Sequence, residues 1–305
     1  MQDRIKALIQ EQGLPDSFNE LVKNYYQPLA ATMARRFELR NSPTKGTWMV
    51  GLQGTQGSGK STCALFLKEI LEQAFQLKTV VLSIDDFYLT RAERLTLSND
   101  IHPLLKTRGV PGTHDLKLLQ QTLEQLSALK SHEFFRIPRF DKAIDDRKPK
   151  ADWDEIEGPV DIVILEGWCV GIDAQDESAL ERPINDLEAQ EDQTGTWRNY
   201  VNNQLRGVYG DLYRQLEYLI VLQAPSFNCV HEWRLLQENK LRNKLQLVGN
   251  ANDDQKLMTA EQIARFIAHY QRLTQQALST LADKADWTMY LGFDHDITKS
   301  VTKER

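Results

Sequence analysis

The sequence predicts an α/β fold, with a mostly parallel central sheet between two layers of helices. Short apolar runs at 79–84, 160–165 and 218–222 are separated by longer segments with helical spacing. Continuous apolar runs of this length are typical of parallel strands that are covered on both faces. Strands that alternate with helices are typical of βαβ units, which form such a sheet.

A glycine-rich motif reinforces this prediction. Gly-x-x-x-x-Gly-Lys-Ser runs from Gly54 to Ser61, after an apolar run at 48–52 and before an amphipathic segment from Cys63 to Phe75. Strand, glycine-rich turn and helix are the context of a phosphate-binding P-loop. We therefore expect a three-layer sandwich of the P-loop NTPase type. The predicted nucleotide-binding residues are Gly54, Thr55, Gln56, Gly57, Ser58, Gly59, Lys60, Ser61 and Thr62.

The chemistry of this loop predicts a bound nucleotide and Mg²⁺, and the resemblance given below implies that the nucleotide is ATP. Backbone N–H groups and the positive end of the next helix form a nest for the β-phosphate. Lys60 would reach the β- and γ-phosphates, and the Ser61 hydroxyl would bind the magnesium ion. The alternative is a glycine-rich loop that only turns the chain, which the strand before it and the helix after it disfavour.

Carboxylates follow two of the predicted strands. Asp85 and Asp86 follow the run at 79–84, and Glu166 follows the run at 160–165. Ligands of open α/β sheets bind at the carboxyl ends of strands. Side chains alternate along a strand, so only one of Asp85 and Asp86 should enter the site, unless both cap the next segment. With Ser61, Asp85 and Glu166 are the predicted metal-site residues.

Two central segments have more than one interpretation. Residues 91–115 resemble a loop, and 106–115 mix cations, hydroxyls and glycines. That mixture suits an anionic or hydroxylated ligand, and it equally suits a surface loop with Thr113 or Asp115 capping the next helix. Residues 134–142 place basic side chains beside aromatic ones, which favours a small-substrate pocket wall over a nucleic-acid surface in an acidic chain.

The remaining segments complete the predicted organisation. We expect residues 1–45 to be a helical extension packed on a core domain of 46–305, and the acid-rich segment 173–196 to lie on the surface. A helix should span about 197–213, and 287–291 should be a last strand. Residues 227–257 could fold over the phosphates as a lid with Arg234, or Arg234, Glu238 and Arg242 could form a surface ladder at i, i+4 and i+8.

Composition excludes some classes of protein. The 305-residue chain has a net charge of −6, which argues against a nucleic-acid partner, and it has no apolar run of the roughly 20 residues that cross a bilayer. Cys63, Cys169 and Cys229 are far apart and stand in apolar surroundings. With no secretory h-region at the N-terminus, they indicate reduced thiols in a cytoplasmic protein. The oligomeric state is left open.

The motifs together resemble the P-loop small-molecule kinases, which include uridine kinase, pantothenate kinase and phosphoribulokinase. The resemblance rests on Gly54–Ser61, on 83–88, on Phe140-Asp141 and on 165–167. More narrowly, 108–115, 138–142, 166–168 and 233–235 resemble D-glycerate 3-kinase of the plant and cyanobacterial type, and equally its bacterial and fungal kinase-like relatives. The resemblance implies that Asp85 accepts the proton of the attacking hydroxyl and that Glu166 supports magnesium or that base.

The resemblance implies transfer of the ATP γ-phosphoryl group to a primary hydroxyl of a small molecule, with D-glycerate as the best guess. The expected catalytic residues are Lys60, Asp85, Glu166 and Arg234. Arginine forks hold carboxylates best, so Arg108 and Arg139 would bind the acid group. The alternatives are a kinase for pantothenate or a nucleoside, and an ATPase switch without a small acceptor. The expected acceptor-binding residues are Asp85, Tyr88, Arg108, His114, Asp115, Arg139 and Asp141.

Overall fold

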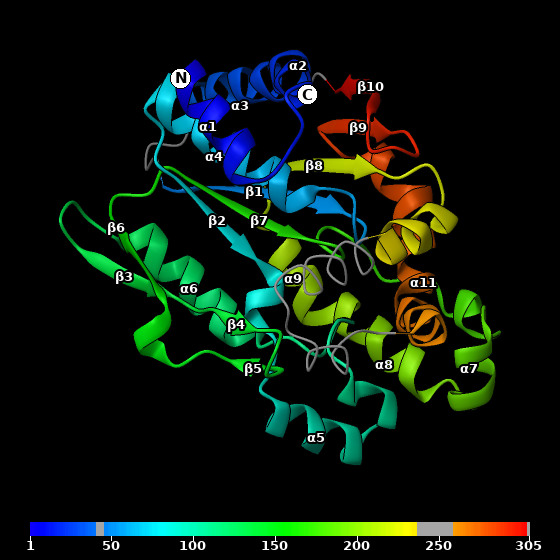
Figure 1. Cartoon of the computed structure of the whole chain (residues 1–305). Coiled ribbons are helices and arrows are strands. Elements are labelled where there is room, and N and C mark those ends of the chain that lie inside the picture. Colours follow the sequence, from blue (N-terminus) through cyan, green and yellow to red (C-terminus); the bar gives the residue numbers. More distant parts are fainter. Residues whose placement is uncertain (41–45, 237–258, 304–305) are drawn as a thin grey trace, which may run out of the picture.

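The computed structural model describes residues 1–40, 46–236 and 259–303, and its centre is a six-stranded sheet (Figure 1). The strands lie in the order β10-β9-β8-β1-β7-β2. All pairs are parallel except that of β9 with β10, so the predicted mostly parallel sheet is confirmed. The strands are β1 (Trp48–Gly54), β2 (Thr79–Ser83), β7 (Ile162–Gly167), β8 (Tyr218–Gln223), β9 (Trp287–Leu291) and β10 (Ile297–Thr302).

Helices cover both faces of this sheet (Figure 1). On β7, Ile162 and Ile164 pack in one hydrophobic cluster, whereas Val163 and Leu165 pack in the other. The first cluster includes residues of α1 (Gln2–Glu11), α3 (Gln27–Leu39) and α4 (Lys60–Phe75). The second includes residues of α6 (Leu116–Ala128), α8 (Thr196–Gln204), α9 (Gly210–Tyr213) and α11 (Ala260–Lys284). The predicted three-layer α/β sandwich is therefore confirmed.

The N-terminal helices share their core with the helix of the glycine-rich loop. α2 (Phe18–Leu21) continues through a π-helical turn into α3, and Phe18 lies 5.2 Å from the ring of Phe66 on α4. Leu29 of α3 is fully buried in the same cluster. The boundary proposed at residue 45 lies outside the described residues.

The predicted loop over 91–115 is wrong in its first half. α5 (Arg91–Asp100) begins with a capping box between Thr90 and Glu93, and a 3₁₀ turn follows at Pro103–Lys106. The one fully buried side chain of α5 is Arg94. A helix that buries an arginine has no apolar stripe, so its periodicity is not visible in the sequence.

Most residues of the acid-rich segment 173–196 are exposed, as predicted, but the segment also has buried residues that were not predicted. It contains a 3₁₀ turn and α7 (Asp186–Glu191), and two of its carboxylates are buried. Glu188 pairs with Arg272 at 2.6 Å, and Asp192 pairs with Arg198 at 2.9 Å. Acidic residues are mostly solvated unless paired, and the arginines that pair these two come from other segments of the chain.

Residues 134–157 form two pairs of short strands. β3 (Phe134–Ile137) pairs with β6 (Asp154–Glu157), and β4 (Phe140–Asp141) pairs with β5 (Asp146–Arg147). β10 also follows the strand that we expected to be the last. Residues 227–236 are helical, and the rest of the predicted lid lies outside the described residues.

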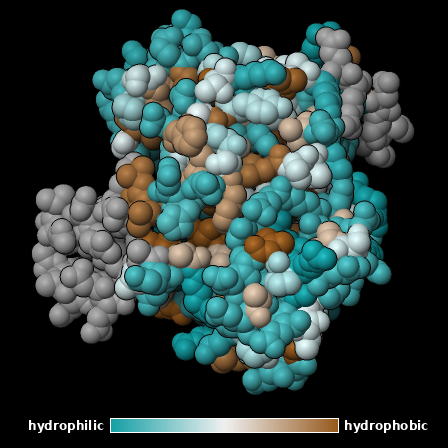
Figure 2. Space-filling view, turned by 90° about the vertical axis from the view of Figure 1, so that its right-hand side faces the viewer, coloured by the Kyte–Doolittle hydropathy of each residue, from teal (hydrophilic) through white to brown (hydrophobic). Residues whose placement is uncertain are grey.

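Within the described part of the chain, no helix is both long enough and apolar enough to cross a membrane. Most residues on the face seen in Figure 2 are hydrophilic, with hydrophobic ones interspersed among them. Large exposed hydrophobic side chains are spread over the chain, for example Leu39, Phe134 and Phe293.

Candidate active site

The sheet brings three strand ends together. β1 lies between β7 and β8, and β7 lies between β1 and β2. Leu52 on β1 and Ser83 on β2 are both register partners of Glu166 on β7. The glycine-rich loop after β1, Glu166 at the end of β7 and Asp85 just beyond β2 therefore meet at one edge of the sheet, where ligands of such sheets bind.

The loop after β1 folds tightly enough to require glycine. A Cβ at Gly54 would lie 2.4 Å from the Ser58 hydroxyl oxygen. Gly57 has a φ of 79°, and a Cβ there would lie 2.8 Å from the Cβ of Trp233. Three buried polar atoms of this loop have no hydrogen-bond partner among the described residues: Thr55 Oγ1, Gln56 Oε1 and Ser58 Oγ. Unpaired buried polar atoms are costly, so they favour a polar ligand in the loop.

Ser61 and Glu166 form an oxygen site beside the loop. The Ser61 hydroxyl donates to Glu166 Oε1 at 2.9 Å. Glu166 is 4% exposed, and its Oε2 is buried without a partner among the described residues. Those residues contain no cluster of three His, Cys, Asp or Glu side chains that could hold a metal. One hydroxyl and one carboxylate fit Mg²⁺, which takes its remaining oxygens from waters and phosphates.

Asp85 lies in a 3₁₀ turn, Ile84–Phe87, directly after β2. Its Oδ1 accepts a hydrogen bond from the Tyr88 hydroxyl at 2.8 Å, and its Oδ2 accepts one from Lys142 at 2.5 Å. Burial opposes ionisation, but the ammonium groups of Lys142 and Lys60 and these hydrogen bonds lower the pKa of Asp85 to about 2. Asp85 is thus an ionised acceptor of hydrogen bonds near the phosphate-binding lysine.

Asp86 has different partners. Arg139 donates to its Oδ2 at 2.6 Å, and the backbone N–H of Phe140 donates to its Oδ1 at 3.1 Å. Burial raises the pKa of Asp86 even though Arg139 opposes that change. The two neighbouring acids therefore point to different groups, although they stand in a 3₁₀ turn and not in the strand from which we inferred their divergence.

The segment 109–114 is buried, so the surface-loop interpretation of it is wrong. His114 stacks on Tyr88 with ring centroids 4.6 Å apart, and its Nδ1 lies 2.7 Å from the Tyr209 hydroxyl. The Tyr209 hydroxyl also accepts a hydrogen bond from the backbone N–H of Gly112 at 2.9 Å. Burial lowers the pKa of His114 to about 4.

The other expected acceptor residues are tied to protein groups. Asp115 caps α6 by accepting from Leu118 N–H at 2.9 Å, as predicted, and it also pairs with Arg147. Arg108 pairs with Asp145, and Arg139 pairs with Asp154 in addition to Asp86. Asp141 accepts from the Ala143 N–H at 2.8 Å in the turn between β4 and β5.

Arg234 contacts an aromatic side chain of α11. Its guanidinium stands 5.8 Å above the ring of Phe266 on α11. The adjacent Trp233 instead contacts the glycine-rich loop near Gly57. The helical segment 227–236 therefore reaches the predicted phosphate site through its tryptophan in this structure.

Two site residues, Lys142 and His295, were missed in the sequence. Trp233 stacks on His295 with centroids 4.2 Å apart, and His295 Nε2 donates to the Gly57 carbonyl at 2.8 Å. These contacts join segments far apart in the chain, so no local sequence pattern predicts them. Lys142 lies within the 138–142 motif, but its contact with Asp85 depends on the β4–β5 turn.

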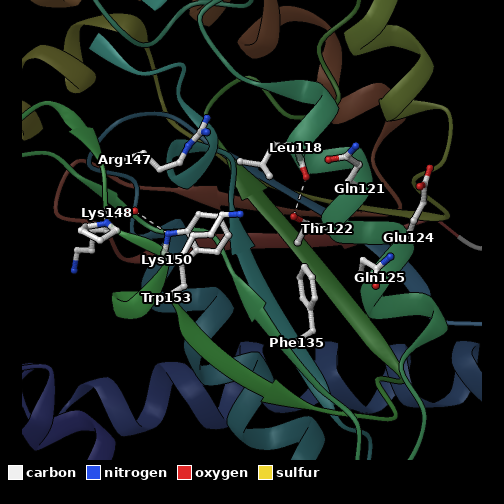
Figure 3. Close-up of a pocket in the computed structure, with 11 residues that line it drawn as sticks. Leu118, Gln121, Thr122, Glu124, Gln125, Phe135, Arg147, Lys148, Lys150 and Trp153 are labelled. Carbon is white, nitrogen blue, oxygen red and sulfur yellow. Dashed lines mark hydrogen bonds between the residues drawn. The ribbon is translucent and has the colours of Figure 1, made fainter. Parts of the chain in front are cut away.

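The cavity of about 790 Å³ shown in Figure 3 lies between α6 and residues 147–153. Phe135 and Trp153 point into it, and Arg147, which pairs with Asp115, also lines it. Neither the glycine-rich loop nor Asp85 lines this cavity. The strand-end geometry, and not the size of this cavity, therefore locates the candidate active site.

No family model matches the chain. Among curated proteins, it is 31% identical over 260 residues to an uncharacterized kinase of Schizosaccharomyces pombe, covering 81% of this chain and 87% of that protein. It is 33% identical over 276 residues to a probable ATP-dependent kinase of Saccharomyces cerevisiae, covering 83% and 86%. It is also 30% identical over 272 residues to the chloroplastic D-glycerate 3-kinase of Arabidopsis thaliana, covering 85% of this chain and 55% of that protein.

A solved structure agrees with these matches. The D-glycerate 3-kinase of Cryptococcus neoformans superposes with a TM-score of 0.74 and 26% identity, over 93% of this chain and 99% of that one. Shorter matches to pantothenate kinases include one from Shewanella sediminis, 30% identical over 147 residues, or 48% of this chain and 44% of that protein. A kinase with ATP as its phosphate donor is therefore indicated, and the chain belongs to the P-loop kinases of the pantothenate and uridine kinase superfamily.

Proposed function

We propose that the protein transfers the γ-phosphoryl group of ATP to a primary hydroxyl of a small hydroxy acid, with D-glycerate as the best candidate. The observation that carries the proposal is the ionised Asp85 carboxylate, which lies beyond β2 near Lys60 and at the same sheet edge as Glu166. Similarity to two D-glycerate 3-kinases supports the choice of acceptor.

In this mechanism the protein chiefly positions groups and stabilises charge, because phosphoryl transfer has a loose transition state. The backbone N–H groups of the glycine-rich loop and Lys60 would hold the β- and γ-phosphates. Asp85 would orient the acceptor hydroxyl for in-line attack and take its proton. Ser61 and Glu166 would hold Mg²⁺, which would neutralise part of the phosphate charge when bound with ATP.

The test is a panel of acceptors with Mg·ATP: D-glycerate, glycerol, pantothenate and uridine, read by phosphate transfer and ADP release. We expect D-glycerate to be phosphorylated. Transfer to pantothenate or uridine alone would show that D-glycerate is not the acceptor. ADP release that no acceptor stimulates would favour an ATPase switch.

The role of Asp85 has its own test. Asp85→Asn removes the proton acceptor and should lower kcat by about a hundred- to ten-thousand-fold, with ATP binding retained. Asp100→Asn, at the exposed end of α5, is the matched control and should leave kcat unchanged. Full transfer by Asp85→Asn would refute the base assignment.

A further inference from the structure

Lys142 forms an ion pair with Asp85, and this pair must change when an acceptor hydroxyl binds to Asp85. Its ammonium lies 2.5 Å from Asp85 Oδ2, on the carboxylate that would receive the acceptor hydroxyl. Among the described residues, Asp85 is its only ion-pair partner. An incoming acceptor must therefore share or replace this contact.

The second partner of Asp85 is not free to move aside. Tyr88 is 3% exposed, stacks on His114 and meets Phe140 edge-on at 5.3 Å. The Lys142 side chain, by contrast, is 58% exposed. Since Tyr88 is packed and Lys142 is solvated, the acceptor hydroxyl would approach Asp85 from the side of Lys142.

The backbone that carries Lys142 is held at several points. Arg94, which is 2% exposed, donates to the Asp145 carbonyl at 2.8 Å and pairs with the Asp145 carboxylate at 2.9 Å. Arg108 pairs with the same carboxylate and donates to the Lys142 carbonyl at 3.4 Å. The ammonium can therefore swing on its flexible stem while the β4–β5 turn stays in place.

The neighbouring cations already have protein carboxylates that the reaction does not use. Arg108 pairs with Asp145, Arg139 with Asp86 and Asp154, and Arg147 with Asp115. Lys142 differs because its partner is the proposed base itself. A neutral alcohol that displaced Lys142 would leave the ammonium without an anion, whereas a hydroxy acid would bring a carboxylate to replace Asp85.

We propose that Lys142 is the acceptor-recognition residue, which pairs with Asp85 in the free enzyme and with the acceptor's carboxylate in the complex. This inference rests on the proposed function, and it selects hydroxy acids over neutral polyols as the substrate class. It also assigns the carboxylate contact to Lys142 in place of Arg108 and Arg139, whose guanidiniums support the turn and the neighbouring strand instead.

The experiment compares D-glycerate with glycerol, in which a neutral hydroxymethyl group replaces the carboxylate. For the wild-type enzyme, kcat/KM should be far higher for D-glycerate. Lys142→Met should reduce this preference by about 10- to 100-fold, mainly through a higher KM for D-glycerate, because a charge-assisted contact is lost. Lys142→Arg should restore part of the preference, and kcat/KM for glycerol should not fall.

Lys150→Met is the control, since Lys150 is exposed and lies over Trp153, away from Asp85. It should leave the preference unchanged, and thermal melting should show that all variants are folded. An unchanged preference in Lys142→Met, or an equal loss with both acceptors, would overturn the inference while leaving the kinase proposal intact. A wild-type enzyme that phosphorylates no hydroxy acid would overturn both. If another hydroxy acid is the substrate, that acid and its reduced alcohol form the test pair.

Discussion

Single residues show how far the motif spacing predicts the site. The spacing from Gly54 to Ser61 predicts the phosphate loop because the glycines, the lysine and the serine that such a loop needs are close together in the sequence. Asp85 and Glu166 could be placed because strand ends are recognisable and parallel strands end at one edge. Lys142 could not, because its contact joins residues 57 positions apart through a turn of two short strands.

His114 gives a prediction for pH dependence. Burial lowers its pKa to about 4 in the folded protein, whereas an unfolded histidine titrates near 6.5. Between pH 4 and pH 6.5 the imidazole is therefore protonated in the unfolded chain but neutral in the folded chain. The contribution of His114 to stability is fully present above pH 6.5 and falls as the pH is lowered towards 4. From pH 7 to pH 5, His114 should cost about 2 kcal/mol of unfolding free energy.

Urea unfolding of wild type and His114→Gln at both pH values measures this difference. The variant should lose about 2 kcal/mol less than the wild type between pH 7 and pH 5. His132→Gln, at a side chain that is 91% exposed, should behave as the wild type does. Equal pH dependence of wild type and His114→Gln would show that His114 is not held neutral.

At the scale of elements, the sequence predicts those that bury apolar side chains. The sheet strands and the helix after the glycine-rich loop follow from such patterns, and so does the helical run from about 197 to 213. α5 was missed because an arginine occupies its buried position, and the burial of two carboxylates in 173–196 was missed because acids are usually exposed. A hydropathy pattern treats a charge as solvated, and only the distant partner shows that it is not.

Arg94 tests whether α5 supports the acceptor side of the site. Arg94→Met removes the donor to the carbonyls of Leu89, Lys106 and Asp145 and breaks the ion pair of Arg94 with the partly exposed Asp145. We expect a loss of about 3 kcal/mol in stability, because three backbone carbonyls lose their donor at about 1 kcal/mol each. The acceptor KM should rise because the β4–β5 turn loses its support, while the ATP KM should change little.

Arg91→Met is the matched control, because Arg91 is exposed on the first turn of the same helix. It should change neither stability nor KM measurably. Steady-state kinetics at a temperature where Arg94→Met is folded separates the two effects. If Arg94→Met were folded and had the wild-type acceptor KM, α5 would be excluded as a support of the site.

At the scale of the whole molecule, the N-terminal helices and the sheet share one hydrophobic cluster. Leu29 and Met33 of α3 are buried with Phe66 of the P-loop helix and with Val50 of β1. A segment that contributes to the common core should unfold together with it and not before it. The helix that presents Lys60 and Ser61 should therefore depend on residues 1–40 for its stability.

Leu29→Ala tests this dependence. Removing a fully buried leucine should cost about 2–5 kcal/mol and lower the Tm of the whole molecule in a single transition. Leu39→Ala, on the same helix at a side chain that is 62% exposed, should leave the Tm nearly unchanged. Far-UV circular dichroism and the loss of bound nucleotide, followed on heating, should give the same midpoint for each variant. An early transition that leaves nucleotide binding intact would instead make residues 1–40 an independent unit. Added ATP should raise the Tm of Leu29→Ala, because a ligand that binds only the folded state adds about 2.7 kcal/mol at a hundred times its Kd.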